Sequence, residues 1–348
     1  MPTDFTIAGR RIGSSEPPFV IAELSGNHNG RIERALALID AAAEAGADAV
    51  KLQTYTAQTI TIDHRGPGFV IEEGLWAGRS LYELYSEAST PFEWHEALFR
   101  RAADRGVIAF SSPFDETAVD LLEQLGAPAF KIASFEAIDL PLIRRAAQSG
   151  MPLIISTGMT RPEEIVEAVD AARSAGADVA LLHCVSTYPA RFEDANLRMI
   201  PRLAEDFDCV AGLSDHTPGV AAAVAAVALG ACIIEKHFTL ARADGGPDSA
   251  FSLEPLELAQ LVRNCRQAWE ALGQADYRRG EAETANRQFR RSLYVVRDVA
   301  RGAPITDQDV RSIRPGFGLE PKRLPEILGR VARRDLARGE PFSLDMIG

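Results

Sequence analysis

Short apolar runs alternate with amphipathic stretches along most of the chain, and this alternation predicts the fold. Eight runs rich in β-branched and aromatic residues, typical of buried parallel strands, cover residues 19–25, 48–55, 107–114, 129–134, 152–159, 179–186, 209–216 and 232–238. The stretches between them, such as RIERALALIDAAAEAG and RPEEIVEAVDAARSAG, carry apolar residues at helical spacing. Strict β/α alternation over about 250 residues predicts a (β/α)8 barrel, the TIM barrel. A doubly wound sheet is the alternative, but no GxGxxG motif follows the first run.

The remaining segments predict the domain organisation. Residues 1–18 are expected to form a β-hairpin cap, and the barrel domain is expected to cover residues 19–271. The segment 56–89, between the second strand and its helix, is unusually long and is expected to carry small elements of its own over the active face. Residues 272–290 are polar and predict a linker. In residues 291–348 the phrases VVRDVARGAPIT and VARRDLARGEPFS echo each other, which predicts a separate small β-rich domain that docks on another surface.

Composition and charge exclude several functions. The 348 residues are 46% hydrophobic and carry a formal net charge of −12, which argues against non-specific binding to nucleic acid or to anionic membranes. The longest apolar run, 220–234, is too short to span a bilayer. The N-terminal MPTDFTIAGRRIG lacks the apolar core of a signal peptide, and the four cysteines show no CxxC spacing. We therefore expect a cytoplasmic protein whose cysteines are small core residues, with a cysteine metal site as the alternative.

The lysines are few and unusually placed. The chain has four lysines against 33 arginines, and Lys51, Lys131 and Lys236 lie inside apolar, strand-like segments. Burying an ammonium group costs several kcal/mol unless an anion compensates it. Internal carboxylates would satisfy one isolated lysine. Three such lysines, each near Ser, Gln or His, indicate a bound anion such as a phosphate.

Polar residues end every predicted strand. In a TIM barrel the catalytic groups gather at these carboxyl ends, whereas the interior needs only packed side chains. The strand ends carry Glu23, Ser25, Asn27 and His28; Lys51, Gln53 and Tyr55; Ser111, Ser112 and Asp115; Lys131, Ser134 and Glu136; Ser156 and Thr157; His183, Ser186 and Tyr188; Ser214, Asp215 and His216; and Glu235, Lys236 and His237. Such a complete polar ring predicts a functional site.

Two histidines in this ring predict a metal site. His216 and His237 end the last two strands, which are neighbours in a closed barrel, and Asp215 and Glu235 lie beside them. Two imidazoles leave positions open for water and substrate oxygens, as a Lewis-acid centre requires.

Strand alternation assigns other residues different roles. Lys51 and Gln53 point the same way, whereas Lys236 is expected to point toward the helices and pair with a carboxylate. His64 and His95, in the long segment and a helix, are expected to be solvated or structural. Trp76, in GLWAG, either closes over a ligand or anchors its loop.

The strand-end motifs resemble those of the sialic acid synthase family over essentially the whole chain. The matching pieces are AELSGNHNG, ADAVKLQTYT, FSSPFD, FKIASFE, ISTGM, LLHCVSTYP, GLSDHT, IEKHF and GGPDSAFSLEP. The C-terminal segment resembles the antifreeze-like (SAF) domain that follows the barrel in this family. Within the family, AELSGNHNG, GLWAG and KIASFEAIDLPLI are most similar to the pseudaminic acid synthases.

The resemblance implies a reaction and a set of site residues. Phosphoenolpyruvate condenses with an aldehyde-form amino sugar, which for the pseudaminate branch is 2,4-diacetamido-2,4,6-trideoxy-L-altropyranose, and phosphate is released. The residues implied for phosphoenolpyruvate are Lys51, Gln53, Ser112, Lys131, Ser134, Ser156, Ser186 and Ser214. His216 and His237 would hold Mn²⁺ or Mg²⁺, while Glu23, Tyr188 and Asp248 would contact the sugar and Glu23 would also position groups or transfer a proton. Arg314 would reach a partner subunit's site in a domain-swapped homodimer.

Three alternatives remain open at this point. A relative of the same family could make N-acetylneuraminate or legionaminate, with the same barrel and different sugar contacts. A metal-dependent aldolase or phospho-sugar synthase, such as one that makes 3-deoxy-octulosonate 8-phosphate, would leave the small domain without a role. A non-catalytic carbohydrate-binding or coat protein could also use this fold.

Overall fold

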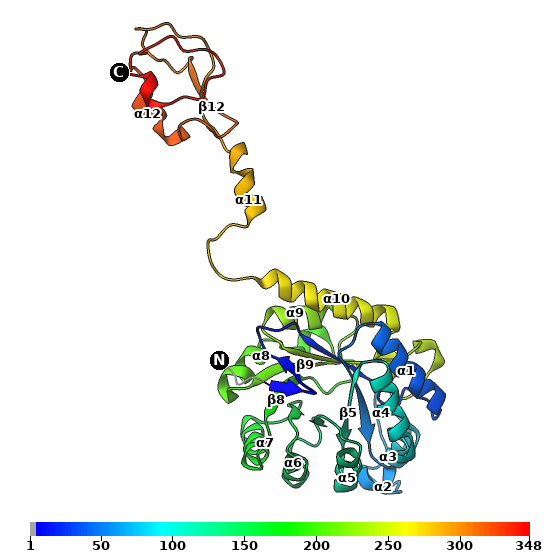
Figure 1. The fold of residues 1–348 in the computed structure, drawn as a ribbon. Helices are drawn as coiled ribbons and strands as arrows, with labels where there is room; N and C mark the ends of the chain where they lie inside the picture. Colours follow the sequence, from blue (N-terminus) through cyan, green and yellow to red (C-terminus); the bar gives the residue numbers. More distant parts are fainter. Residues whose placement is uncertain (1–4) are drawn as a thin grey trace. The chain divides into compact units, whose positions relative to one another are not determined.

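A computed structural model describes residues 5–348, and its main feature is a closed barrel of eight parallel strands (Figure 1). The strands are β3 (Phe19–Glu23), β4 (Ala49–Thr54), β5 (Ile108–Pro113), β6 (Phe130–Ile132), β7 (Leu153–Ser156), β8 (Val179–Cys184), β9 (Val210–Asp215) and β10 (Ile233–His237). Strands that are consecutive in sequence pair with each other around the barrel. β10 closes it by pairing with both β9 and β3. All eight lie within the predicted ranges, and the predicted fold class is confirmed.

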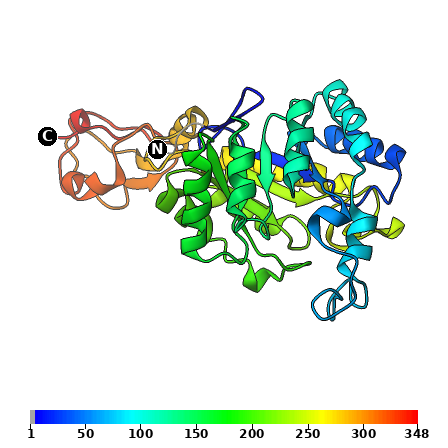
Figure 2. The same ribbon diagram turned by 90° about the horizontal axis from the view of Figure 1, so that it is seen from below.

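Helices surround the barrel, as Figures 1 and 2 show. Each buries one face against it. They are α1 (Ile32–Glu44), α4 (His95–Asp104), α5 (Glu116–Gln124), α6 (Leu140–Ala147), α7 (Pro162–Ser174), α8 (Met199–Phe207), α9 (Ala221–Ala228) and α10 (Pro255–Leu272). In α1 the buried side chains follow helical spacing, at Ala35, Leu38, Ile39 and Ala42. These faces and the outward strand residues form one continuous apolar layer around the barrel.

A second apolar core fills the barrel near the amino ends of the strands. It includes Phe19, Phe110 and Ile233 from the strands. The hairpin of β1 (Phe5–Ile7) and β2 (Arg10–Ile12) adds Phe5 and Ile7 to the same core. That end of the barrel is therefore packed with apolar side chains, which leaves the carboxyl ends of the strands for polar chemistry.

The long segment after β4 carries elements of its own. It contains α2 (Ala57–Ile60) and α3 (Leu81–Ala88). Between them the chain folds back on itself, because the Ile71 amide donates to the Arg79 carbonyl (2.9 Å) and the Leu81 amide donates to the Phe69 carbonyl (2.9 Å). This small ladder gives the segment a defined shape rather than that of an open loop.

The chain forms two compact units, one ending at Gly273 and the other covering Gln274–Gly348. The second contains α11 (Glu281–Ala285), β11 (Ser292–Val295), β12 (Val310–Ile313) and α12 (Leu324–Ile327) around its own small core. The two echoed phrases pair with each other here, since Val299 and Leu336 exchange backbone hydrogen bonds of 2.9 and 2.8 Å. The predicted boundaries at residues 18, 271 and 290 stay predictions.

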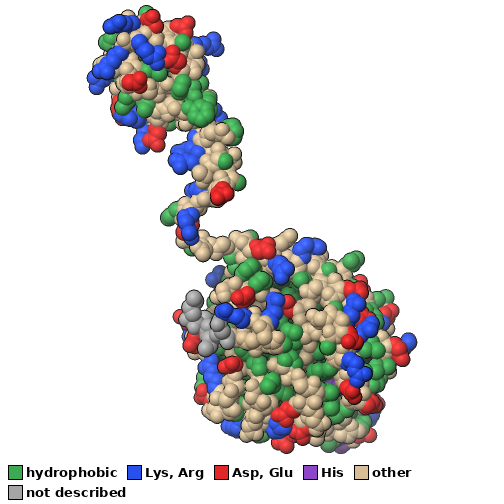
Figure 3. Space-filling model, viewed as in Figure 1, with side chains coloured by type: hydrophobic (Ala, Val, Ile, Leu, Met, Phe, Trp, Pro, Cys, Tyr) green, Lys and Arg blue, Asp and Glu red, His purple; other side chains and the backbone are tan. Residues whose placement is uncertain are grey.

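Surface charges of both signs occur on the face of each unit shown in Figure 3. In the described part of the chain, every helix is too short or too polar to cross a bilayer.

Candidate active site

Two lysines and two glutamates occupy the centre of the barrel's carboxyl end. Lys51 Nζ lies 2.6 Å from Glu23 Oε2 and 3.8 Å from Glu235 Oε1, and Lys131 Nζ lies 3.5 Å from Glu235 Oε1. All four residues are at most 4% exposed. Because β6 and β10 are not neighbours, the Lys131–Glu235 contact crosses the barrel axis. Internal carboxylates therefore already balance much of the lysine charge.

Hydroxyl and amide groups surround the lysines. Lys51 donates to Ser112 Oγ (3.2 Å) and Lys131 donates to Ser156 Oγ (2.7 Å). Three further contacts complete the set, Gln53 to Glu23 (2.9 Å), Ser134 to Ser186 (2.8 Å) and Ser214 to Glu235 (3.0 Å). The structure thus brings together all eight residues assigned to phosphoenolpyruvate. Their role there stays a prediction.

Gly158 makes room for this hydroxyl cluster. A Cβ at that position would lie 2.2 Å from Ser186 Oγ and 3.2 Å from Ser134 Cβ. Only glycine lets the two serines approach each other beside the loop that follows β7.

Burial and neighbouring charges set the ionisation of the central groups. Burial raises the pKa of Glu23, even though Lys51 opposes it. The pKa of Glu235 is lowered, because Lys131 and Lys51 together outweigh its burial. Burial lowers the pKa of Lys131 despite Glu235. A phosphate close to Lys131 would favour its charged form and so oppose the effect of burial on its pKa.

The two predicted metal ligands lie side by side at the ends of β9 and β10. The ring centroids of His216 and His237 are 5.4 Å apart. His216 Nδ1 donates to the Val185 carbonyl (2.9 Å), so in the neutral ring the lone pair lies on Nε2. Burial lowers the pKa of His237 well below its usual value, and His216 adds to this effect, so His237 is neutral and suited to bind a metal.

Two buried polar atoms in this region fit a metal site. His237 Nδ1 and Glu235 Oε2 are buried and have no hydrogen-bond partner among the described residues. The part of the chain that the structure describes contains no cluster of three or more histidine, cysteine or acidic side chains arranged to hold a metal. A metal here would therefore take two protein nitrogens and complete its coordination with water or substrate oxygens.

Tyr188 and Asp248 extend the site beyond the histidines. The Tyr188 ring lies 4.3 Å from the His216 ring and 5.3 Å from the Phe251 ring. Asp248 accepts a hydrogen bond from Ser25, and burial, with help from Glu23, raises its pKa to about 7. Aromatic rings beside a carboxyl group offer apolar contact and a hydrogen-bonding group to one ligand.

The comparisons with known proteins agree with this arrangement. The model of the NeuB family matches residues 38–277, and the model of the SAF domain matches residues 290–348. The chain belongs to the NeuB family. It is 45% identical to the pseudaminic acid synthase of Campylobacter jejuni (92% of this chain, 94% of the relative) and 42% identical to that of Helicobacter pylori (95% and 98%). The solved N-acetylneuraminic acid (sialic acid) synthetase of Leptospira borgpetersenii, with citrate, is 34% identical and has a TM-score of 0.74 (82% of this chain, 95% of that chain). The resemblance to the sialic acid synthases and to the SAF domain is confirmed.

Several histidines of this NeuB-family chain are structural. His95 contacts Thr54 Oγ1 (2.8 Å) inside the helix layer, and His183 donates to the Ala195 carbonyl (2.8 Å). His28, a member of the predicted polar ring, accepts from the Gly30 amide (3.1 Å). These side chains are satisfied by local partners.

Two residues of the site had no assigned role in the sequence analysis. Glu136 follows β6, its Oε2 is buried without a hydrogen-bond partner among the described residues, and burial raises its pKa to about 7. Burial raises the pKa of Tyr85, from α3, and the charges of Glu136 and Asp248 add to this effect. Glu136 was visible as a strand-end residue, whereas nothing in the sequence linked α3 to the site.

Arg314 lies in the C-terminal unit of the NeuB-family chain, directly after β12. Its predicted contact with a partner's sugar stays a prediction.

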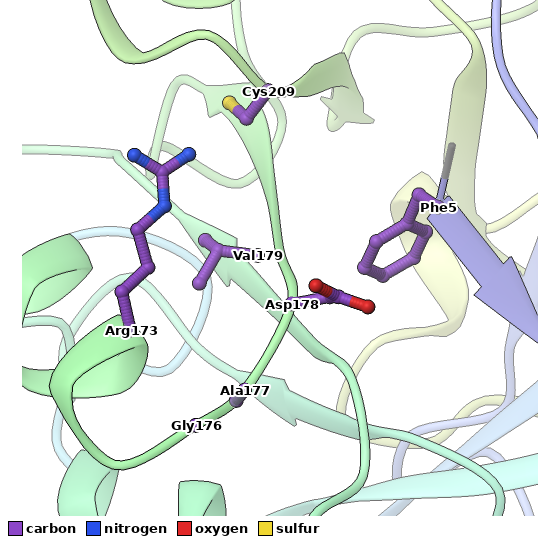
Figure 4. A pocket seen from close by; sticks show the side chains of 7 residues that line it. All are labelled: Phe5, Arg173, Gly176, Ala177, Asp178, Val179 and Cys209. Carbon is purple, nitrogen blue, oxygen red and sulfur yellow. The ribbon is translucent and has the colours of Figure 1, made fainter. Parts of the chain in front are cut away.

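A cavity of about 300 Å³ lies at the opposite end of the barrel (Figure 4). It is lined by Phe5, Arg173, Gly176, Ala177, Asp178, Val179 and Cys209. Arg173 already donates to the carbonyls of Phe207 (2.7 Å) and Asp208 (3.2 Å). The catalytic candidates of this NeuB-family barrel are at the other end, so we assign the cavity no part in the reaction.

Proposed function

We propose that this NeuB-family protein is a pseudaminic acid synthase, which condenses phosphoenolpyruvate with 2,4-diacetamido-2,4,6-trideoxy-L-altropyranose in its open-chain form. The observation that carries the proposal is the juxtaposition of the Lys51–Lys131 pair with the His216–His237 pair at one end of the barrel. Relatives 45% and 42% identical that carry this name support the choice of sugar. Family membership sets aside the 3-deoxy-octulosonate 8-phosphate alternative.

In the proposed reaction, C3 of phosphoenolpyruvate attacks the aldehyde carbon, water adds at C2, and phosphate leaves with cleavage of the C–O bond. Lys51 and Lys131 bind the phosphate with the surrounding serine hydroxyls and stabilise its charge as it departs. Fixed donors are most effective in a buried site such as this one, where water is excluded.

Glu23 is the candidate for proton transfer. Its carboxylate is held between Lys51 (2.6 Å) and Gln53 (2.9 Å) and is fully buried. A carboxyl group whose pKa is raised by burial accepts a proton from water or a sugar hydroxyl more readily than an exposed one.

We propose that His216 and His237 hold Mn²⁺ or Mg²⁺. When bound there, the divalent cation supplies Lewis-acid polarisation of the sugar carbonyl. His216 Nε2 is not used in the bond to Val185, and His237 Nδ1 has no hydrogen-bond partner among the described residues; both support this assignment.

We further propose a domain-swapped homodimer, in which Arg314 reaches the partner's sugar, working in the cytoplasm. The four free, buried cysteines suit a reducing compartment.

Phosphate release with a panel of sugars tests the function. We expect turnover with the diacetamido altrose derivative that exceeds turnover with N-acetylmannosamine and with the diacetamido sugar of the legionaminate branch. EDTA should abolish release and Mn²⁺ should restore it, and His216→Ala should not bind Mn²⁺, whereas His64→Ala, an exposed control, should behave as wild type. Preference for N-acetylmannosamine would refute the sugar assignment. Full turnover in EDTA would refute the metal, and no turnover with any sugar would favour a binding protein.

A further inference from the structure

Trp76 connects the long segment after β4 to the loop that follows β10. Its indole Nε1 donates to the Pro247 carbonyl (2.8 Å), although the two residues are 171 positions apart. Pro247 directly precedes Asp248, a candidate sugar contact. The Ile71–Arg79 ladder holds the segment that carries Trp76.

The acceptor of this hydrogen bond is itself fixed. Asn29 Nδ2 donates to the Gly245 carbonyl (3.1 Å). Gly246 has φ +122°, and a Cβ there would lie 2.3 Å from Asn29 Oδ1. Glycine is therefore required at position 246 for this close approach. These contacts hold the loop that carries the Pro247 carbonyl, to which the indole donates.

The Trp76 ring borders the sugar side of the site. Its centroid lies 5.9 Å from the Tyr188 ring, at 52° to it, and Tyr188 lies 4.3 Å from His216. Trp76, Tyr188 and His216 thus form a row of rings that leads from the long segment to the histidine pair. Trp76 is only partly buried, so part of its ring surface is accessible.

This region combines two kinds of side chain. Glu23 and Asp248 offer carboxyl groups to sugar hydroxyl and amide groups, whereas Trp76 and Tyr188 offer ring faces. A sugar hydroxyl placed against the indole face would lose its hydrogen bond to water without a replacement, whereas a methyl group would gain contact.

We infer that Trp76 is a specificity-determining residue, whose ring forms an apolar wall that selects a 6-deoxy sugar with a methyl group over its 6-hydroxy counterpart. This inference rests on the proposed function and deepens it. An apolar wall of this kind discriminates between the two sugars by about 10- to 100-fold, because they differ only in the lost hydration of one hydroxyl group.

The test measures kcat/KM for the diacetamido trideoxy sugar and for its 6-hydroxy analogue, and takes their ratio. Trp76→Ala should lower the ratio about tenfold or more and leave the KM for phosphoenolpyruvate unchanged. Trp76→Phe keeps a ring but loses the bond to Pro247, so it should retain most of the ratio. Ile62→Ala, an exposed position in the same segment, is the matched control. An unchanged ratio in Trp76→Ala overturns the inference, as does a Phe variant as defective as the Ala variant, because Trp76 would then act only as an anchor.

A second readout separates failure of the inference from failure of the proposed function. The difference in tryptophan emission between wild type and Trp76→Phe reports on Trp76, since Trp94 contacts His28 and Trp269 donates to the Ser14 carbonyl (3.2 Å). Addition of the sugar that is turned over should change this emission in the presence of phosphoenolpyruvate. Turnover of N-acetylmannosamine alone refutes the pseudaminate assignment and the selection of a 6-deoxy sugar together. Turnover of the diacetamido sugar with no change in emission refutes the inference and leaves the proposed function intact.

Discussion

Lys236 Nζ lies 2.6 Å from Asp215 Oδ2, and both side chains are only 1% exposed. Lys236 also donates to the Thr217 carbonyl, while the Thr217 amide and hydroxyl donate to Asp215 Oδ1 (2.9 and 2.7 Å). His216 lies between Asp215 and Thr217 in sequence, and His237 follows Lys236. This ion pair therefore connects β10 to β9 directly beside the two candidate metal ligands. The ion pair lies on one face of the strands and the two histidines lie on the other.

We predict that Lys236→Met destabilises the fold by about 3–5 kcal/mol, because it leaves the Asp215 carboxylate buried without its counter-charge. Urea unfolding of the metal-free protein measures this loss. The double variant Lys236→Met/Asp215→Asn should recover most of the stability, since the amide oxygen of the new side chain still accepts from Thr217 and no charge remains. A loss below about 1 kcal/mol in the single variant would contradict a buried ion pair.

We predict that the same pair positions the histidines. The double variant should bind Mn²⁺ about 10- to 100-fold more weakly than wild type even where its stability is restored, as is typical when a group that orients metal ligands is lost. Calorimetry or the electron paramagnetic resonance signal of Mn²⁺ measures the affinity directly. Equal affinity in the two proteins would assign the pair a purely structural role.

The four lysines of the chain supply a matched test of the anion site. We predict that Lys131→Met lowers kcat/KM for phosphoenolpyruvate about 10- to 150-fold, because a charge-assisted hydrogen bond contributes about 1.5–3 kcal/mol. Lys322→Met is the control, since Lys322 pairs with Glu320 (2.5 Å) on the surface of the C-terminal unit. Phosphate release against phosphoenolpyruvate concentration measures both. Equal losses in the two variants, or none in either, would remove Lys131 from the anion site.

Much of the fold follows from the sequence, because each barrel strand is a separate buried apolar run. The period-2 rule also placed Lys51 and Gln53 on one side of β4, and the two side chains reach the two oxygens of the same carboxylate, Glu23. The same rule predicted that the Lys236 side chain points away from those of the residues on either side of it, and Lys236 pairs with Asp215. These are relationships within one strand or between neighbours.

Contacts across the barrel could not be predicted in the same way. The Lys131–Glu235 approach depends on strand tilt and closure, and the Trp76–Pro247 hydrogen bond joins two loops whose paths no local pattern encodes. For the same reason, the sequence predicted that Lys236 would find a carboxylate but did not identify Asp215.

Glu136 predicts a pH dependence of stability. Its pKa is raised by burial to about 7 from 4.5, so the folded protein binds a proton that the unfolded chain releases between these values. Stability should therefore fall as the pH rises from about 4.5 to 7, by at most about 3 kcal/mol. Glu136→Gln should be more stable than wild type at pH 8 and equal to it near pH 4.5, as measured by thermal unfolding. The exposed control Glu72→Gln should show no such gain, and a gain in Glu136→Gln that does not vary with pH would contradict the raised pKa.

Mixing two impaired variants tests whether Arg314 acts on a partner's site. Arg314→Ala and Lys131→Met should each be much less active than wild type alone, Lys131→Met by the 10- to 150-fold in kcat/KM predicted above. In a swapped dimer of one chain of each kind, the barrel with intact Lys131 receives the intact Arg314 of the other chain, so one of its two sites works. Random mixing through co-expression then restores about a quarter of wild-type activity per chain. If Arg314 instead served its own chain's barrel, every site would lack one group and the mixture would stay as impaired as the single variants.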